Sequence, residues 1–122
     1  MKKVLVIEDN KDNLILITYA LKRHEYEVIS AETGEEALEM AIKENYFFII
    51  MDIDLPGIDG VETTERIRSS GNKIPIIAIT SFAMAGDRER ILAAGCNGYF
   101  EKPIDPITIV DRIHMILGVE QK

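Results

Sequence analysis

Short apolar runs alternate along the chain with longer stretches whose apolar residues recur at helical spacing. Three of the five runs are almost continuously apolar, which is typical of parallel strands covered by helices on both faces. The alternation predicts the order βαβαβαβαβα, a parallel sheet and right-handed crossovers between its strands. The predicted strands are residues 4–7, 27–30, 47–51, 74–80 and 98–101.

Polar residues and glycine indicate where the intervening helices begin and end. Thr33 and Asp59 each stand three residues before a glutamate, which is the spacing of a capping box. Gly95 follows an apolar helical stretch, a position where glycine often ends a helix. Asp105, followed by a proline, predicts the N-cap and first position of a last helix over residues 107–117.

The composition describes one acidic domain. The chain has 122 residues, 47% of them hydrophobic, which is enough to bury a core. The net charge of −7, from 14 basic and 21 acidic residues, argues against a general nucleic-acid binder. No apolar run approaches the ~20 residues of a membrane span, and Cys96 has no partner for an internal disulfide. We expect one domain over residues 1–122, in the cytoplasm, without a membrane or nucleic-acid partner.

Charged and polar residues stand at the ends of four of the five predicted strands. In chain order these residues are Glu8 with Asp9, then Asp52, Thr80 and Lys102. Because parallel strands end at the same edge of a sheet, we expect these side chains to converge. Three carboxylates in close proximity repel one another unless a cation lies among them, and oxygen ligands suit Mg²⁺.

A divalent metal, a lysine and a hydroxyl beside a carboxylate form a set suited to phosphoryl transfer. In such a set Asp52 would be the nucleophile that forms an acyl phosphate. The alternative is that each carboxylate only caps the helix that follows its strand. The agreement of four strand ends on one chemistry favours the shared site.

Four short motifs carry a resemblance to a known family: Glu8-Asp9-Asn10, the run 51–60, Thr80-Ser81 and Lys102-Pro103. Together they resemble the receiver domain of two-component response regulators, over essentially the whole chain. The resemblance implies a flavodoxin-like, doubly wound α/β fold, (βα)5, with five parallel strands in the order 2-1-3-4-5. That order would place the acidic pair beside Asp52 at the switch point of the sheet.

The resemblance also implies roles at the acidic cluster. Asp52 would accept a phosphoryl group from a phosphohistidine on a partner. Asp9 and Asp52 would bind Mg²⁺ directly, and Glu8 would bind it through water. The backbone carbonyl of Asp54 would be a further metal ligand. The protein would promote only its own phosphorylation and dephosphorylation, so it is expected to be a signalling switch and not an enzyme.

Other residues would, by the same resemblance, sense the phosphoryl group. Lys102 would form an ion pair with the phosphoryl oxygens. The Lys102-Pro103 peptide bond that follows it is often cis in the family. Thr80 would move to hydrogen-bond these oxygens, and Tyr99 would swing inward as the switch aromatic. Asp54 and Phe82 occupy two positions that tune the lifetime of the phosphorylated state.

The resemblance further implies partners for the chain. Its runs 8–13 and 82–87 look like those of receivers from hybrid kinases and single-domain phosphorelay proteins. The expected partners are a histidine kinase or a histidine phosphotransfer domain, and a downstream protein target. Because many regulators add a DNA-binding domain after the receiver, the chain is either a free-standing receiver or a piece of a longer protein.

The first predicted helix suggests a docking surface for such a partner. Its four consecutive apolar residues, 14–17, cannot all face one core at ~100° per residue. Leu16 and Ile17 share an arc with the later apolar residues, whereas Leu14 and Ile15 fall beside polar ones. We therefore expect Leu14 and Ile15 to be exposed next to Asp9 and to contact a helical partner that carries the histidine.

Two other functions are compatible with parts of the pattern. Asp52 and Asp54 resemble the nucleophile loop of haloacid-dehalogenase-type phosphatases, but that motif usually ends the first strand of its fold. A receiver-like binding module that never takes phosphate usually lacks the phosphoacceptor, an acidic residue or the lysine, and all of these are present here.

Overall fold

Strands and helices alternate along the chain, as the apolar pattern predicts. The structure is a computed structural model that describes residues 1–82 and 84–119, so Ala83, within the run 82–87, lies outside the described residues. The described elements are β1 (Lys3–Ile7), α1 (Lys11–Arg23), β2 (Glu27–Ala31), α2 (Gly34–Lys43), β3 (Phe48–Asp52), α3 (Gly60–Ser69), β4 (Ile76–Thr80), α4 (Ala85–Ala94), β5 (Gly98–Glu101) and α5 (Ile109–Leu117).

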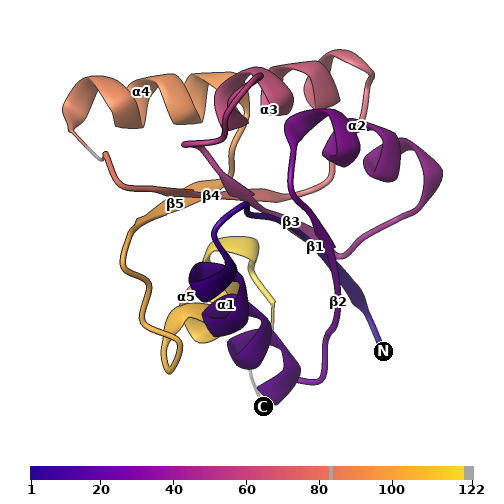
Figure 1. Ribbon diagram of the computed structural model, residues 1–122, viewed down its shortest axis with the longest axis vertical. Helices are drawn as coiled ribbons and strands as arrows, with labels where there is room; N and C mark the ends of the chain where they lie inside the picture. Colours follow the sequence, from indigo (N-terminus) through magenta and orange to yellow (C-terminus); the bar gives the residue numbers. More distant parts are fainter. Residues whose placement is uncertain (83, 120–122) are drawn as a thin grey trace.

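All strand pairs in the described sheet are parallel, in the order β2-β1-β3-β4-β5. Figure 1 shows α1 and α5 on one face of the sheet and α2, α3 and α4 on the other. The predicted flavodoxin-like fold and strand order are therefore confirmed. None of the helices in residues 1–82 and 84–119 is long and apolar enough to cross a membrane.

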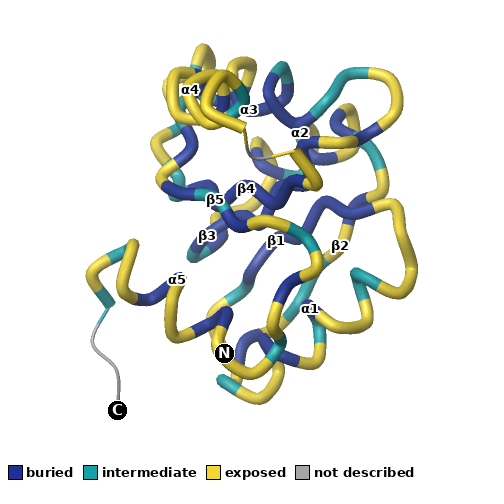
Figure 2. The backbone as a smooth tube through the Cα atoms, turned by 90° about the vertical axis from the view of Figure 1, so that its left-hand side faces the viewer, coloured by how far each residue is buried: buried dark blue, intermediate teal, exposed yellow. Residues whose placement is uncertain are grey.

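The continuously apolar strands supply two cores, one on each face of the sheet. In β1, Leu5 and Ile7 pack on the side of α2–α4, whereas Val4 and Val6 pack on the side of α1 and α5. Figure 2 shows the buried strands between helices that are exposed on their outer sides. Each large apolar side chain buried in this way stabilises the fold by ~1.5–3 kcal/mol, so the sheet is a firm support for the residues at its edge.

The predicted N-caps of α2 and α3 are present. The Thr33 hydroxyl accepts a hydrogen bond from the Glu36 N–H at 3.1 Å, and Asp59 accepts one from the Glu62 N–H at 2.9 Å. Helix α4 ends at Gly95, whose φ of 115° lies in the left-handed region that glycine adopts without strain.

The predicted start of the last helix is wrong by two residues. Helix α5 begins at Ile109, with Thr108 as its N-cap. Asp105 instead closes a turn before the helix, because its carboxylate accepts from the Ile107 N–H at 2.9 Å and from the Thr108 hydroxyl at 3.1 Å. The predicted fourth strand also starts too early. Strand β4 begins at Ile76, after Pro75, which has no N–H for the sheet.

Candidate functional site

The acidic residues at the ends of β1 and β3 meet at one edge of the sheet. Glu8 and Asp9 follow β1, and Asp52 is the last residue of the neighbouring strand β3. One carboxylate oxygen of each residue lies within 4.8 Å of the others, so the three could hold a metal ion. Glu8 and Asp52 are buried, and Asp9 is exposed. The cluster is thus closed on the protein side and open to solvent at Asp9.

The Glu8 carboxylate has too few hydrogen-bond donors for a buried charge. Its Oε2 accepts from the Asn10 N–H at 3.1 Å, but its buried Oε1 has no hydrogen-bond partner among the described residues. Burial, and then the neighbouring Asp52, raise the pKa of Glu8 from 4.5 to about 7. A buried carboxylate oxygen that accepts no hydrogen bond, among hard oxygen ligands, fits a cation such as Mg²⁺.

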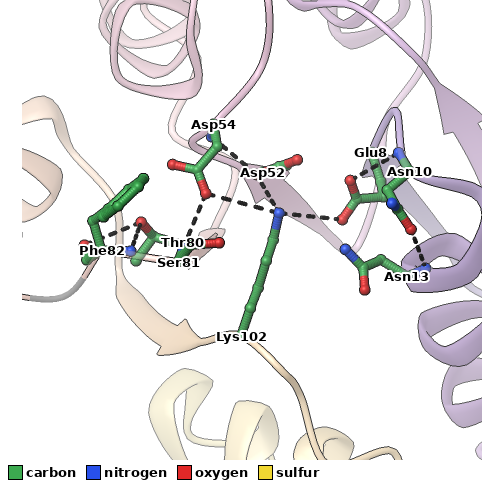
Figure 3. A network of polar contacts seen from close by, with 9 residues as sticks. All are labelled: Glu8, Asn10, Asn13, Asp52, Asp54, Thr80, Ser81, Phe82 and Lys102. Carbon is green, nitrogen blue, oxygen red and sulfur yellow. Dashed lines mark hydrogen bonds and ion pairs between the residues drawn. The ribbon is translucent and has the colours of Figure 1, made fainter.

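Lys102 brings a positive charge into this acidic cluster from the residue after β5. Its Nζ lies 3.0 Å from Asp52 Oδ1, 3.8 Å from Asp54 Oδ2 and 3.9 Å from Glu8 Oε1 (Figure 3). Burial by itself would lower the pKa of this ammonium, but the hydrogen bond to Asp52 and the three carboxylate charges raise the pKa above its usual range. Lys102 therefore stays protonated at neutral pH.

The Asp52 side chain is held by one of its two oxygens. Oδ1 accepts hydrogen bonds from the Asp54 N–H at 2.9 Å and from Lys102 Nζ, whereas Oδ2 accepts none from the described residues. Gly60 lets α3 approach this strand end, because a Cβ at that position would meet the Asp52 carbonyl and lie 2.7 Å from Ile53 Cα. The result is a fixed carboxylate with one oxygen left for a metal or a phosphorus atom.

The polar groups at the end of β4 are already engaged within the protein. The Thr80 hydroxyl donates to the Phe82 carbonyl at 3.1 Å and accepts from the Phe82 N–H at 3.0 Å. The Ser81 N–H donates to Asp54 Oδ2 at 2.9 Å. These bonds join the loop after β4 to the loop after β3 and to itself (Figure 3).

This arrangement of carboxylates, lysine and hydroxyl matches a known family over most of the chain. The family described as the response regulator receiver domain matches residues 4–114. The chain belongs to this receiver family. A receiver is a signalling switch and not a conventional enzyme, so the alternative of a haloacid-dehalogenase-type phosphatase is wrong.

Individual relatives of this receiver match over nearly its full length. The polar-differentiation response regulator DivK of Brucella ovis is 39% identical over 119 residues, which are 96% of this chain and 97% of the relative. The receiver domain of the sensor histidine kinase PA1611 from Pseudomonas aeruginosa, whose structure has a magnesium ion coordinated in the active site cleft, is 35% identical with a TM-score of 0.86. That alignment covers 96% of this chain and 98% of the other.

A chemotaxis protein gives a similar structural match. The chemotaxis response regulator CheY4 of Vibrio cholerae is 28% identical to this receiver, with a TM-score of 0.88. The match covers 95% of this chain and 98% of the chemotaxis protein. The chain therefore shares its fold, over nearly its whole length, with both of these solved receivers.

Tyr99 and the Lys102-Pro103 bond are two further features that the resemblance singles out. Tyr99, in β5, is half-buried against the core beside α2–α4, and the Arg88 guanidinium lies 5.8 Å from its ring centroid. The Lys102-Pro103 peptide bond is cis, as predicted.

The predicted docking residues of α1 differ in exposure. Ile15 is 64% exposed, as predicted. Leu14 is only half-exposed, because it packs against the core formed with α5, so its predicted exposure is wrong in part. Leu16, placed on the core-facing arc by its spacing, is exposed instead. The apolar surface of α1 is therefore formed by Ile15, Leu16 and Tyr19.

One site contact could not be found from the sequence pattern. The sequence predicts a backbone metal ligand and a lifetime-tuning position at Asp54, but it does not predict the contacts of the side chain, which accepts from the Ser81 N–H and faces Lys102. The residues involved are 27 positions apart or more. The sequence offers one indication of this contact: Asp54 is a carboxylate two positions after Asp52, and it therefore lies close to the strand end that holds the site.

Proposed function

We propose that this receiver accepts a phosphoryl group on Asp52, in the presence of Mg²⁺ held by Glu8, Asp9 and Asp52. The observation that carries the proposal is the meeting of three carboxylates beside the Lys102 ammonium, with one buried carboxylate oxygen that accepts no hydrogen bond from the described residues. The Asp54 backbone carbonyl would add a fourth ligand. Bound Mg²⁺ would neutralise the carboxylates and attract the phosphoryl oxygens.

The transfer step uses the free oxygen of Asp52. Oδ2 attacks the phosphorus of a phosphohistidine, the P–O bond forms, and the P–N bond breaks as the imidazole leaves and takes up a proton. Oδ1 keeps its hydrogen bonds with the Asp54 N–H and Lys102, which fix the direction of attack, and it would be the oxygen through which Asp52 binds Mg²⁺. Lys102 also offers its charge to the phosphoryl oxygens, where negative charge accumulates.

The phosphoryl group would then bias a two-state equilibrium of the loop after β4. Its oxygens attract the Thr80 hydroxyl away from the Phe82 backbone, since a charged acceptor binds a donor more strongly than a carbonyl does. Movement of Thr80 leaves room for Tyr99 to turn inward from the core edge. The changed surface of α4, β5 and α5 would be recognised by a downstream protein target.

We also propose one receiver domain over residues 1–122, located in the cytoplasm. Receivers act with histidine kinases, and the partner expected here is a kinase or a histidine phosphotransfer domain. The Brucella relative, a polar-differentiation response regulator, supports this assignment. The exposed Ile15, Leu16 and Tyr19 of α1 would form the apolar part of the docking surface, and the half-buried Leu14 would contribute less to it.

The proposed function is tested by the intact mass of the protein after incubation with Mg²⁺ and a small-molecule phosphodonor. We expect a single phosphoryl adduct that is labile in base, because it is an acyl phosphate. Chelation of Mg²⁺ should slow the labelling by at least about 10-fold, since three carboxylates then repel the donor. No adduct under conditions that label another receiver would favour a module that never takes phosphate.

The docking surface is tested with Ile15→Ser. We expect transfer from a histidine phosphotransfer domain that phosphorylates the wild type to slow by about 10-fold, the effect of losing one buried apolar side chain from an interface. Labelling by the small-molecule donor should not change. The matched control is Ile42→Ser, at an isoleucine of α2 that is also exposed. Equal effects of the two variants would contradict the assignment to α1.

A further inference from the structure

The side chain of Asp54 joins three parts of the site. Asp54 lies two residues after the end of β3, and its Oδ2 accepts a hydrogen bond from the Ser81 N–H, after β4, at 2.9 Å. The same oxygen lies 3.8 Å from Lys102 Nζ, after β5 (Figure 3). One carboxylate oxygen thus faces a backbone donor and an ammonium together.

A backbone N–H and an ammonium are both donors that can stabilise the negative charge of an oxyanion. Lys102 is also within 3.0 Å of Asp52, the proposed phosphoacceptor. Phosphoryl oxygens attached to Asp52 would therefore lie close to the donors that the Asp54 carboxylate now faces. Two anions would compete for one ammonium and one N–H.

The Asp54 side chain has room to leave this position. It is 25% exposed. Together with Thr80, Phe82 and Asp87 it lines a pocket of about 500 Å³ between the two loops and α4. A carboxylate displaced into this pocket keeps its contact with water, so its charge does not become buried.

We propose that the Asp54 carboxylate is an internal competitor of the phosphoryl group, which holds the Ser81 N–H until the phosphoryl group on Asp52 displaces it. The inference rests on the proposed function of Asp52. In the unphosphorylated protein, Asp54 fixes the loop after β4 in its resting position. On phosphorylation the Ser81 N–H changes acceptor, and the Asp54 carboxylate turns further into the pocket. Asp54 acts through Ser81 and Lys102, so it is a positioning residue.

The experiment measures the binding of beryllofluoride, a phosphoryl analogue, with Mg²⁺ in the wild type and in Asp54→Ala. This substitution keeps the backbone carbonyl proposed as a metal ligand. We expect Asp54→Ala to bind beryllofluoride about 10-fold more tightly, because the analogue no longer has to displace a charged acceptor. Asp54→Asn, whose amide oxygen can still accept from Ser81 but carries no charge, should lie between the two.

The Ser81 amide resonance gives a readout that general stability would not change. Before addition of beryllofluoride, its ¹H shift should differ between the wild type and Asp54→Ala, because only the wild type has the carboxylate acceptor. With beryllofluoride bound, the two shifts should become similar, since Ser81 then donates to the same ligand in both. Persistence of the carboxylate-bonded shift in the bound wild type would overturn the proposal.

The matched control is Asp87→Asn, which removes an acidic charge from the same pocket without touching Ser81. The Asp87 carboxylate (Oδ1) lies 3.9 Å from the Arg90 guanidinium (Nη1), and both residues belong to α4. We expect Asp87→Asn to leave the beryllofluoride affinity within about 2-fold of the wild type. An equal increase in beryllofluoride affinity in Asp87→Asn and Asp54→Ala would overturn the inference, because it would show a general effect of removing negative charge.

The outcomes separate this inference from the proposed function. Tight binding by all variants with the same affinity would overturn the role of Asp54 alone and leave Asp52 as the phosphoacceptor. Failure of every variant, the wild type included, to bind beryllofluoride with Mg²⁺ would overturn the proposed function and this inference together.

Discussion

Asp52→Asn is expected to abolish stable phosphorylation of the receiver while leaving its fold intact. The asparagine amide has nearly the shape of the carboxylate, and its oxygen can still accept from the Asp54 N–H. It cannot act as a nucleophile toward phosphorus, because its nitrogen lone pair is delocalised and it carries no negative charge. Intact mass after incubation with Mg²⁺ and a phosphodonor should show no adduct, against one adduct in the wild type.

The matched control for this prediction is Asp59→Asn. Asp59 is the N-cap of α3, and asparagine caps a helix about as well as aspartate does. This variant should therefore fold and be labelled like the wild type. A base-labile adduct in Asp52→Asn at the rate of the control would place the phosphoacceptor at another residue.

The fold was predictable from the sequence because the relevant signals are local. Continuous apolar runs such as residues 4–7 require cover on both faces, and alternation with helices then fixes a parallel sheet. The meeting of Glu8, Asp9 and Asp52 follows from the same topology, since neighbouring parallel strands end at one edge. Neither conclusion depends on how a particular side chain is oriented.

The errors concern features that tertiary contacts determine. The rotation of α1 about its axis depends on how it packs against the sheet and α5, so the spacing alone placed Leu14 outward and Leu16 inward. The Asp105-Pro106 signal is real, but its hydrogen bonds close a turn instead of the first turn of α5. The bond between Asp54 and Ser81 joins two loops, and no local spacing encodes it.

Lys102→Ala is expected to have two large effects, of which the first is on the reaction. The ammonium is the charged donor nearest to Asp52, and its loss removes a fixed positive charge from the place where phosphoryl oxygens would lie. Loss of one such donor slows a reaction by about 100-fold, and we expect labelling by a small-molecule donor to slow to this extent. A rate close to that of the wild type would contradict the role of Lys102.

The second effect of Lys102→Ala is on the response to the phosphoryl group. Phosphoryl oxygens that no longer bind a residue after β5 should not shift Thr80 and Tyr99, even where Asp52 is modified. Amide spectra with and without beryllofluoride and Mg²⁺ should show changes near Asp52 but not in β5. The control is Lys3→Ala, which removes an exposed ion pair with Glu44 and should respond like the wild type.

Loss of this ammonium should also change how stability depends on pH when Mg²⁺ is absent. Because the pKa of Glu8 is about 7 in the folded protein and 4.5 ordinarily, the folded state holds its proton more tightly. The contribution of protonated Glu8 to the free energy of unfolding is thus complete below pH ~4.5 and is lost as the pH rises through about 7. Without Lys102, which lowers the pKa of Glu8, the loss should be larger. Between pH 6 and pH 8, the Tm of Lys102→Ala should fall by more than the Tm of the wild type. Added Mg²⁺ should restore the Tm of Lys102→Ala at pH 8, because the cation replaces the missing positive charge among the carboxylates.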